Sequence, residues 1–155
     1  MSRERIIILE EEENAQWTLK ELLESEGFWV ITANSINQAL EKLREDQIGA
    51  LITEYRINHS TTLDVIREFK KASPEAYVMM LSYGEVQEGE YEKIISSGTD
   101  DFFYKPIAFN KVLLHLGKGL NHRRDLLHKN ELEEELKKIN SEGPFREGRT
   151  TAPYS

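Results

Sequence analysis

The chain has 155 residues, of which 39% are hydrophobic and 31% charged, and its 28 acidic and 20 basic side chains give a formal net charge of −8. This balance argues against a general nucleic-acid-binding protein, which needs a clustered positive surface. No apolar run approaches the roughly 20 residues of a membrane span, and the N-terminal residues do not resemble a signal peptide. The absence of cysteine excludes disulfides and thiolate metal sites. We expect a cytoplasmic domain with an appendage and no nucleic-acid or membrane partner.

Five short apolar runs predict strands. The first, residues 6–9, is wholly apolar and mostly β-branched, which is typical of a strand buried on both faces of a parallel sheet. The others cover residues 28–32, 50–53, 77–81 and 101–104.

Segments with apolar residues at helical spacing lie between and after these runs, at about residues 15–23, 36–43, 63–69, 91–95 and 109–120. Gly27 and Gly98 close the first and fourth of them, Ser35 is a candidate N-cap of the second, and Ser73-Pro74 stops the third. The alternation predicts an α/β fold with a doubly wound, five-stranded parallel sheet.

The chain divides by composition into three parts. Residues 1–120 form the predicted domain, and residues 121–140 form a charged helical extension. Residues 141–155 are rich in glycine, proline and threonine with little to bury, so we expect disorder there.

Polar residues follow four of the predicted strands at the edge of the sheet where ligands of open parallel sheets bind. They are Glu10 and Glu11 after the first strand, Glu54 after the third, Ser82 after the fourth and Lys105 after the fifth. Each one alone has an ordinary explanation, such as the preference for acids before a helix. Together they predict that three carboxylates, a hydroxyl and an ammonium converge on one patch.

Four segments in order resemble the response-regulator receiver domains of two-component signal transduction. Residues 6–12 are similar to the family's apolar strand with its acidic pair, and residues 50–56 to the strand of the phosphoacceptor. Residues 79–84 are similar to the fourth strand with its Thr/Ser, and residues 98–106 to the last strand with its aromatic residue and lysine. The resemblance covers about residues 5–120 and implies a three-layer, flavodoxin-like (βα)5 fold of the chemotaxis type that signals rather than catalyses.

The resemblance also implies a site chemistry and partners. In the family, an acidic pair and an aspartate hold Mg²⁺, a histidine kinase supplies the phosphoryl group, and an output domain responds. The matching positions are Glu10 and Glu11 for the metal acids, Glu54 for the phosphoacceptor, Ser82 and Lys105 for phosphoryl binding, and Phe102 for the switch aromatic.

The chain departs from the family pattern at these positions. Glu54 replaces an aspartate, and a displacement of about 1 Å from in-line geometry can cost about a hundredfold in rate. We therefore expect a phosphorylation-independent interaction module in which Glu54 pairs with Lys105 and partly imitates the activated state. The long side chains of Glu10, Glu11 and Glu54 argue against a regular octahedral Mg²⁺ site. The loop at residues 58–62 lacks the family's proline and glycines and must take another turn.

The sequence leaves one alternative function open and disfavours another. A Mg²⁺-dependent receiver with a non-standard acceptor, such as Ser82, is the alternative function. A nucleotide- or flavin-binding enzyme is disfavoured, because four glutamates and no glycine-rich loop follow the first strand.

The C-terminal helix is similar to the linker of nitrogen-regulation-type activators, in which this helix dimerises receivers. Approximate heptads run through Leu113, Leu116, Leu120 and Leu127 and resume out of phase at Leu132, Leu136 and Ile139. A homodimer and an exposed helix stabilised by pairs such as Glu133 with Lys137 are both consistent with this pattern. No ATPase or helix-turn-helix sequence follows, which leaves a fragment of a larger regulator or a domain that acts through partners.

Overall fold

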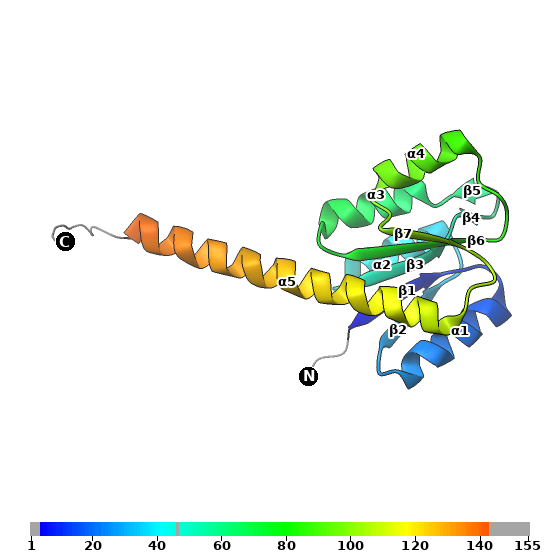
Figure 1. Cartoon of the computed structure of the whole chain (residues 1–155), viewed down its shortest axis with the longest axis horizontal. Coiled ribbons are helices and arrows are strands. Elements are labelled where there is room, and N and C mark those ends of the chain that lie inside the picture. The colour runs from blue at the N-terminus through cyan, green and yellow to red at the C-terminus, as the bar shows by residue number, and fades with distance from the viewer. Residues whose placement is uncertain (1–3, 46, 143–155) are drawn as a thin grey trace. The chain divides into compact units, whose positions relative to one another are not determined.

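The computed structural model describes residues 4–45 and 47–142. Within them, five parallel strands form one sheet in the order β2-β1-β3-β6-β7 (Figure 1). Their bounds are β1 Arg5–Leu9, β2 Trp29–Ala33, β3 Ala50–Glu54, β6 Tyr77–Ser82 and β7 Asp101–Tyr104. The predicted doubly wound, flavodoxin-like sheet is confirmed.

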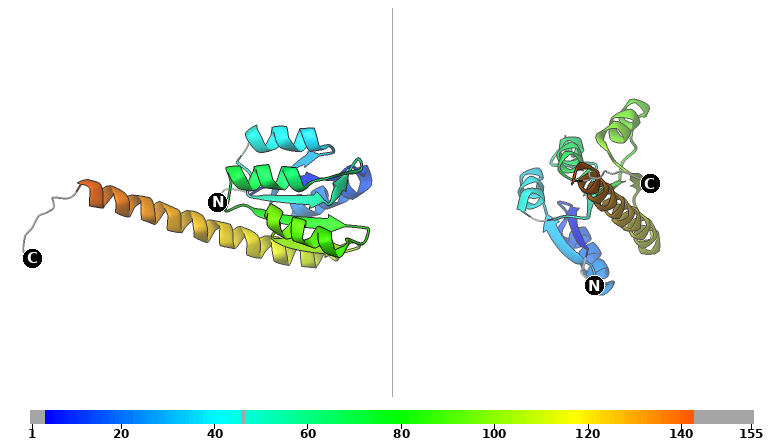
Figure 2. Two further views of the ribbon diagram at one scale, coloured as in Figure 1. Left: turned by 90° about the horizontal axis from the view of Figure 1, so that it is seen from above. Right: turned by 90° about the vertical axis from the view of Figure 1, so that its left-hand side faces the viewer.

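Helices cover both faces of the sheet and give the predicted three layers. Their bounds are α1 Glu13–Ser25, α2 Ile36–Glu45, α3 Leu63–Ala72, α4 Glu88–Ser97 and α5 Phe109–Glu142. α1 and the first part of α5, residues 109–123, lie on one face, and α2, α3 and α4 lie on the other (Figures 1 and 2).

Two hydrophobic clusters, one on each face, follow from the alternation of side chains along each strand. Ile7 and Leu9 of β1 point to the cluster that α2, α3 and α4 complete, for example through Ile66. Ile6 and Ile8 point to the cluster that α1 and the first part of α5 complete, for example through Leu116. The four β1 side chains are at most 1% exposed, which explains why this strand is an unbroken apolar run.

The first part of α5 packs closely against β6 because Gly119 has no side chain. A Cβ at this position would lie 2.2 Å from Cδ1 of Tyr77, which is 5% exposed. The phenol of Tyr77 donates a hydrogen bond to Asp101 Oδ2 at 2.5 Å, which holds its ring in place. Near the end of this part, Arg123 Nη1 lies 3.3 Å from Glu4 Oε2.

The chain divides into two compact units between Arg123 and Arg124. In the second unit, Lys129 pairs with Glu133 at 3.9 Å and Glu134 pairs with Lys137 at 3.8 Å. α5 extends to Glu142, so residues 141 and 142 are helical rather than disordered. The rest of the segment for which we predicted disorder, residues 143–155, lies outside the described residues.

The loop after β3 folds as a short antiparallel hairpin that the sequence did not predict. β4 (Arg56–Ile57) pairs with β5 (Ser60–Thr61), and Asn58 and His59 connect them with φ values of 49° and 67°. Two consecutive left-handed residues form the tight turn of a two-residue hairpin loop. The chain therefore turns here without the glycines and proline that the family pattern contains.

Two predicted helix boundaries are confirmed. The Ser35 hydroxyl accepts a hydrogen bond from Gln38 N at 3.1 Å, as expected for an N-cap, and Gly98 ends α4 in a left-handed conformation. The Lys105–Pro106 bond is cis. None of the helices in the described part of the chain combines the length and hydropathy needed to span a bilayer.

The contact between Gly119 and Tyr77 predicts the effect of Gly119→Ala. The added methyl group should destabilise the protein by about 1–3 kcal/mol, because the Tyr77 ring or α5 must move. Gly117→Ala is the matched control, since its Cβ meets no atom within 4 Å, and it should be neutral or stabilising by up to about 1 kcal/mol. Urea unfolding measures both values, and equal effects of the two substitutions would contradict the packing argument.

Candidate functional site

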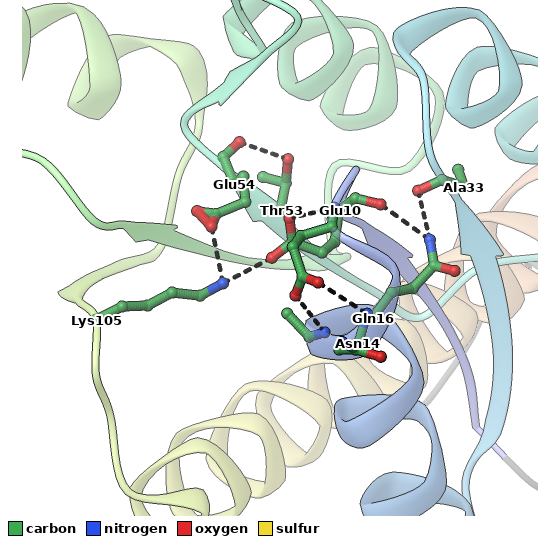
Figure 3. Close-up of polar contacts among 9 residues, drawn as sticks. Glu10, Asn14, Gln16, Ala33, Thr53, Glu54 and Lys105 are labelled. Atoms are coloured by element: carbon green, nitrogen blue, oxygen red, sulfur yellow. Dashed lines mark hydrogen bonds and ion pairs between the residues drawn. The ribbon is translucent and has the colours of Figure 1, made fainter.

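The candidate site is an ion-pair cluster of Lys105, Glu10 and Glu54 at the carboxyl edge of the sheet (Figure 3). Lys105 Nζ lies 2.7 Å from Glu10 Oε1 and 2.7 Å from Glu54 Oε1. The three side chains are 12%, 7% and 10% exposed, in the same order. The ammonium is therefore shared between two carboxylates that water hardly reaches.

The register of the strands brings these residues together. Leu9 of β1 is level with Thr53 of β3, so Glu10 lies beside Glu54 one step further along both strands. Lys105 follows β7 and continues its pairing with β6, since its backbone N–H donates to Ser82 O at 2.8 Å. The ends of β1, β3 and β7 thus deliver the two acids and the lysine, with β6 lying between β3 and β7.

Backbone and side-chain hydrogen bonds hold the two acids in position. Glu10 N donates to Ala33 O at 3.0 Å, and the Gln16 amide donates to Glu10 O at 2.9 Å (Figure 3). The hydroxyls of Thr53 and Thr62 donate to Glu54 O at 2.8 and 2.7 Å. These contacts fix the backbone from which each carboxylate projects.

The pKa values of the cluster reflect burial and shared charge. Burial raises the pKa of Glu54 to about 6, and the neighbouring Glu10 carboxylate adds to this, although the hydrogen bond from Lys105 opposes it. Burial by itself lowers the pKa of Lys105, but the hydrogen bonds to Glu10 and Glu54 outweigh it, so that its pKa lies above the usual value. The lysine stays charged, whereas Glu54 changes its charge in the mildly acidic range.

Glu11 does not join the cluster, in contrast to the predicted convergence of three carboxylates. Its Oε2 accepts a hydrogen bond from Asn58 N at 2.9 Å in the β4–β5 hairpin. Because Glu10 and Glu11 are consecutive, their side chains leave the end of β1 in different directions. Glu11 therefore ties the hairpin to the end of β1.

The Ser82 hydroxyl and the Phe102 ring have partners other than the ion-pair cluster. The Ser82 hydroxyl donates to Gly84 O at 2.9 Å. Phe102 is partly buried against the hydrophobic cluster that α2, α3 and α4 cover. Its ring makes edge-on contacts with the rings of Tyr91 and Tyr104, at centroid distances of 5.7 and 5.1 Å. Its surroundings are those of a packed aromatic residue beside two tyrosines.

The carboxylates as arranged do not fit the Mg²⁺ site that the family resemblance implies. Octahedral Mg²⁺ needs several oxygen ligands around one point, but Lys105 Nζ lies between Glu10 and Glu54 at that point, and Glu11 is bound to the hairpin. Among residues 4–45 and 47–142, no group of three or more His, Cys, Asp or Glu side chains is placed to hold a metal ion.

Some contacts around the site were missed by the sequence analysis. The centroid of the Tyr83 ring lies 4.6 Å from Lys105 Nζ in a cation–π contact. Glu12 caps α1 by accepting from Asn14 N and Ala15 N at 3.1 and 2.7 Å. The position of Glu12 between a strand and a helix was the available signal for the cap.

A second polar link joins the end of β3 to α4. Glu90 Oε2 accepts hydrogen bonds from the Tyr55 hydroxyl and from Arg56 Nη2, the latter at 2.9 Å. Tyr55 directly follows Glu54, so the residue after the cluster is attached to the first turn of α4. Nothing in the spacing of these residues along the chain indicated this contact.

The raised pKa of Glu54 predicts a pH-dependent effect of Glu54→Gln. A carboxyl group whose pKa is higher in the folded than in the unfolded protein weakens folding as it ionises. The free energy of unfolding of the unsubstituted protein should therefore fall relative to that of the variant as pH rises from about 4.5 to about 6, by on the order of 1–2 kcal/mol. Urea unfolding at several pH values, with Glu92→Gln on exposed α4 surface as control, measures the difference. A difference that does not change with pH would contradict the burial argument.

The comparisons with known proteins agree with this geometry. Residues 6–116 match the family model of the response regulator receiver domain. The transcriptional regulatory protein ZraR of Klebsiella oxytoca is 29% identical over 120 residues, which cover 77% of this chain and 27% of ZraR. The chain thus spans about a quarter of the length of this relative.

Solved structures show the same fold. A CheY-like receiver domain protein from Methanospirillum hungatei JF-1 has a TM-score of 0.75 at 18% identity, over 80% of this chain and 98% of that one. The beryllofluoride-activated NtrC4 receiver domain dimer has a TM-score of 0.70 at 23% identity, over 77% of this chain and 98% of that one. By sequence and by fold, the chain belongs to the response regulator receiver domain family of two-component signalling.

Proposed function

We propose that this receiver domain works as a phosphorylation-independent protein-interaction module. The observation that supports this most directly is the 2.7 Å contact between Glu54 Oε1 and Lys105 Nζ. By the family resemblance, Glu54 holds the phosphoacceptor position and Lys105 the position that binds the phosphoryl group. The lysine is already engaged by carboxylates, without any phosphoryl transfer.

The chemistry of Glu54 limits both phosphotransfer and mimicry. Its carboxylate is one methylene further from the backbone than that of an aspartate, and its Oε1 is directed at the ammonium of Lys105. A carboxylate offers one negative charge, whereas a phosphoryl group brings about −1.5 to −2 and three acceptor oxygens. Glu54 therefore imitates in part the contact that a phosphoryl group would make with Lys105. Because this contact is always present, it keeps the domain in one conformation.

The partners that we propose are proteins of two-component systems in the cytoplasm, either a histidine kinase or an output domain. ZraR is a transcriptional regulatory protein of which this chain matches about a quarter. An output module therefore acts either in the same polypeptide or as a separate partner. In this proposal the domain contributes no catalysis of its own.

The proposal predicts no covalent modification by phosphoryl donors. Full-length protein incubated with acetyl phosphate and Mg²⁺ should keep its intact mass, and beryllofluoride should leave its amide NMR spectrum unchanged. Glu54→Asp, treated in parallel, shows whether the rest of the pocket accepts a phosphoryl group. A phosphoryl adduct on Glu54 of the unsubstituted protein would refute the proposal, and one on Ser82 would support a receiver with a non-standard acceptor.

We also propose that two copies of the chain associate through the second half of α5. Leu132, Leu136 and Ile139 follow one another at spacings of four and three residues, and they are 49%, 61% and 65% exposed. This spacing matches the seam of a two-stranded coiled coil. Burial of the three side chains against a second copy would remove apolar surface from water.

Light scattering of the full chain at increasing concentration tests this association. The proposal predicts a mass that rises toward that of a dimer, and a monomer mass for Leu136→Lys, which places a charge in the seam. Asn130→Lys adds the same charge away from the seam and should leave association unchanged. A constant monomer mass for the unsubstituted chain would favour the exposed-helix interpretation.

A further inference from the structure

A cavity of about 420 Å³ lies beside the ion-pair cluster, between α1 and the segment that leads into α5. We call it the α1–α5 cavity. Most of its wall is apolar, and its size falls within the range of small-molecule sites in proteins, about 300–1,000 Å³. Figure 3 shows the ribbons of α1 and α5 on the same side of the cluster.

One wall of the cavity is a face of α1 that the protein itself does not cover completely. Ala15, Leu19 and Leu22 line the cavity, and their spacing of four and three residues places them on one side of the helix. Leu22 is 39% exposed, whereas Leu23, one residue further, is fully buried in the core. Apolar helix surface is thus available to a molecule in the cavity.

The opposite wall comes from the residues after the cis Lys105–Pro106 bond. Ile107, Phe109 and Val112 line it, and Val112 is also part of the core beneath the cavity. An apolar molecule in the cavity would contact both helices and both walls. It would bridge α1 to the start of α5.

The polar end of the cavity is formed by the ion-pair cluster. Glu10, Glu54 and Lys105 line it, and Glu12 lines it as well. Three carboxylates and one ammonium give this end a formal excess of negative charge. A negatively charged ligand would be repelled here, and a positively charged group would be attracted, most strongly by the buried carboxylates of Glu10 and Glu54.

We propose that the α1–α5 cavity binds a small apolar molecule that carries a primary amino group. The hydrocarbon part lies between α1 and the start of α5, and the ammonium lies at the acidic end, where carboxylate oxygens accept its hydrogen bonds. This inference goes beyond the proposed function, since it concerns a small-molecule ligand.

Calorimetric titration of the full chain with three probes of equal length tests the ligand class. n-Hexylamine and n-hexanol share a six-carbon chain, hexanoate has six carbons including that of its carboxylate, and the three differ in the head group. The proposal predicts that the amine binds about tenfold or more tightly than the alcohol, because its hydrogen bonds are charge-assisted, and that hexanoate does not bind. Equal binding of amine and alcohol, or no binding of the amine, would overturn the proposal.

Ala15→Leu and Glu54→Gln, with Ala72→Leu as control, test whether the amine binds in the α1–α5 cavity. Ala15→Leu places a branched side chain on the cavity wall and should weaken amine binding about tenfold or more, whereas Ala72→Leu, on the exposed surface of α3, should leave it unchanged. Glu54→Gln should reduce the preference for amine over alcohol. Circular dichroism checks that each variant is folded. Unchanged amine binding by folded Ala15→Leu would overturn the assignment to this cavity.

Discussion

The sharing of one buried ammonium by two buried carboxylates is the constraint on which the rest of the site depends. Charges removed from water are costly unless each has a partner, and loss of one member of such a group leaves the others uncompensated. Lys105, Glu10 and Glu54 come from three different strand ends, so their mutual attraction fixes these ends relative to one another. In the proposed function, the same contact occupies the lysine at the position that we assign to phosphoryl binding.

The cluster divides the carboxyl edge of the sheet into two regions with different chemistry. On one side, Glu11 and the hairpin form a polar corner through Asn58. On the other, the α1–α5 cavity offers apolar walls beside the same carboxylates. Consecutive residues of one strand end, Glu10 and Glu11, serve the two regions because their side chains diverge. The ion-pair cluster thus lies beside two distinct surfaces, one polar and one apolar.

Sequence reasoning succeeded where burial dictates residue type. The five strands were recognisable because parallel strands covered on both faces need unbroken apolar runs, as residues 6–9 illustrate. The contact of Lys105 with Glu10 and Glu54 could be expected, because the carboxyl ends of parallel strands meet at one edge of the sheet. The hairpin was missed because its turn uses Asn58 and His59 in left-handed conformations without a glycine. The direction of Glu11 was missed although it follows from the alternation of consecutive side chains. The direction of the Ser82 hydroxyl was missed because it donates to the nearby Gly84 carbonyl oxygen instead of pointing to the site.

The hairpin after β3 has a consequence for recognition. Its two central residues already hold backbone angles that most side chains avoid, and the Glu11 carboxylate anchors the turn by accepting a hydrogen bond from Asn58 N. A protein that binds this corner meets a surface whose shape is set before contact, so little conformational entropy is lost on association. Selectivity at this corner then comes from fit to a rigid projection instead of from loop ordering.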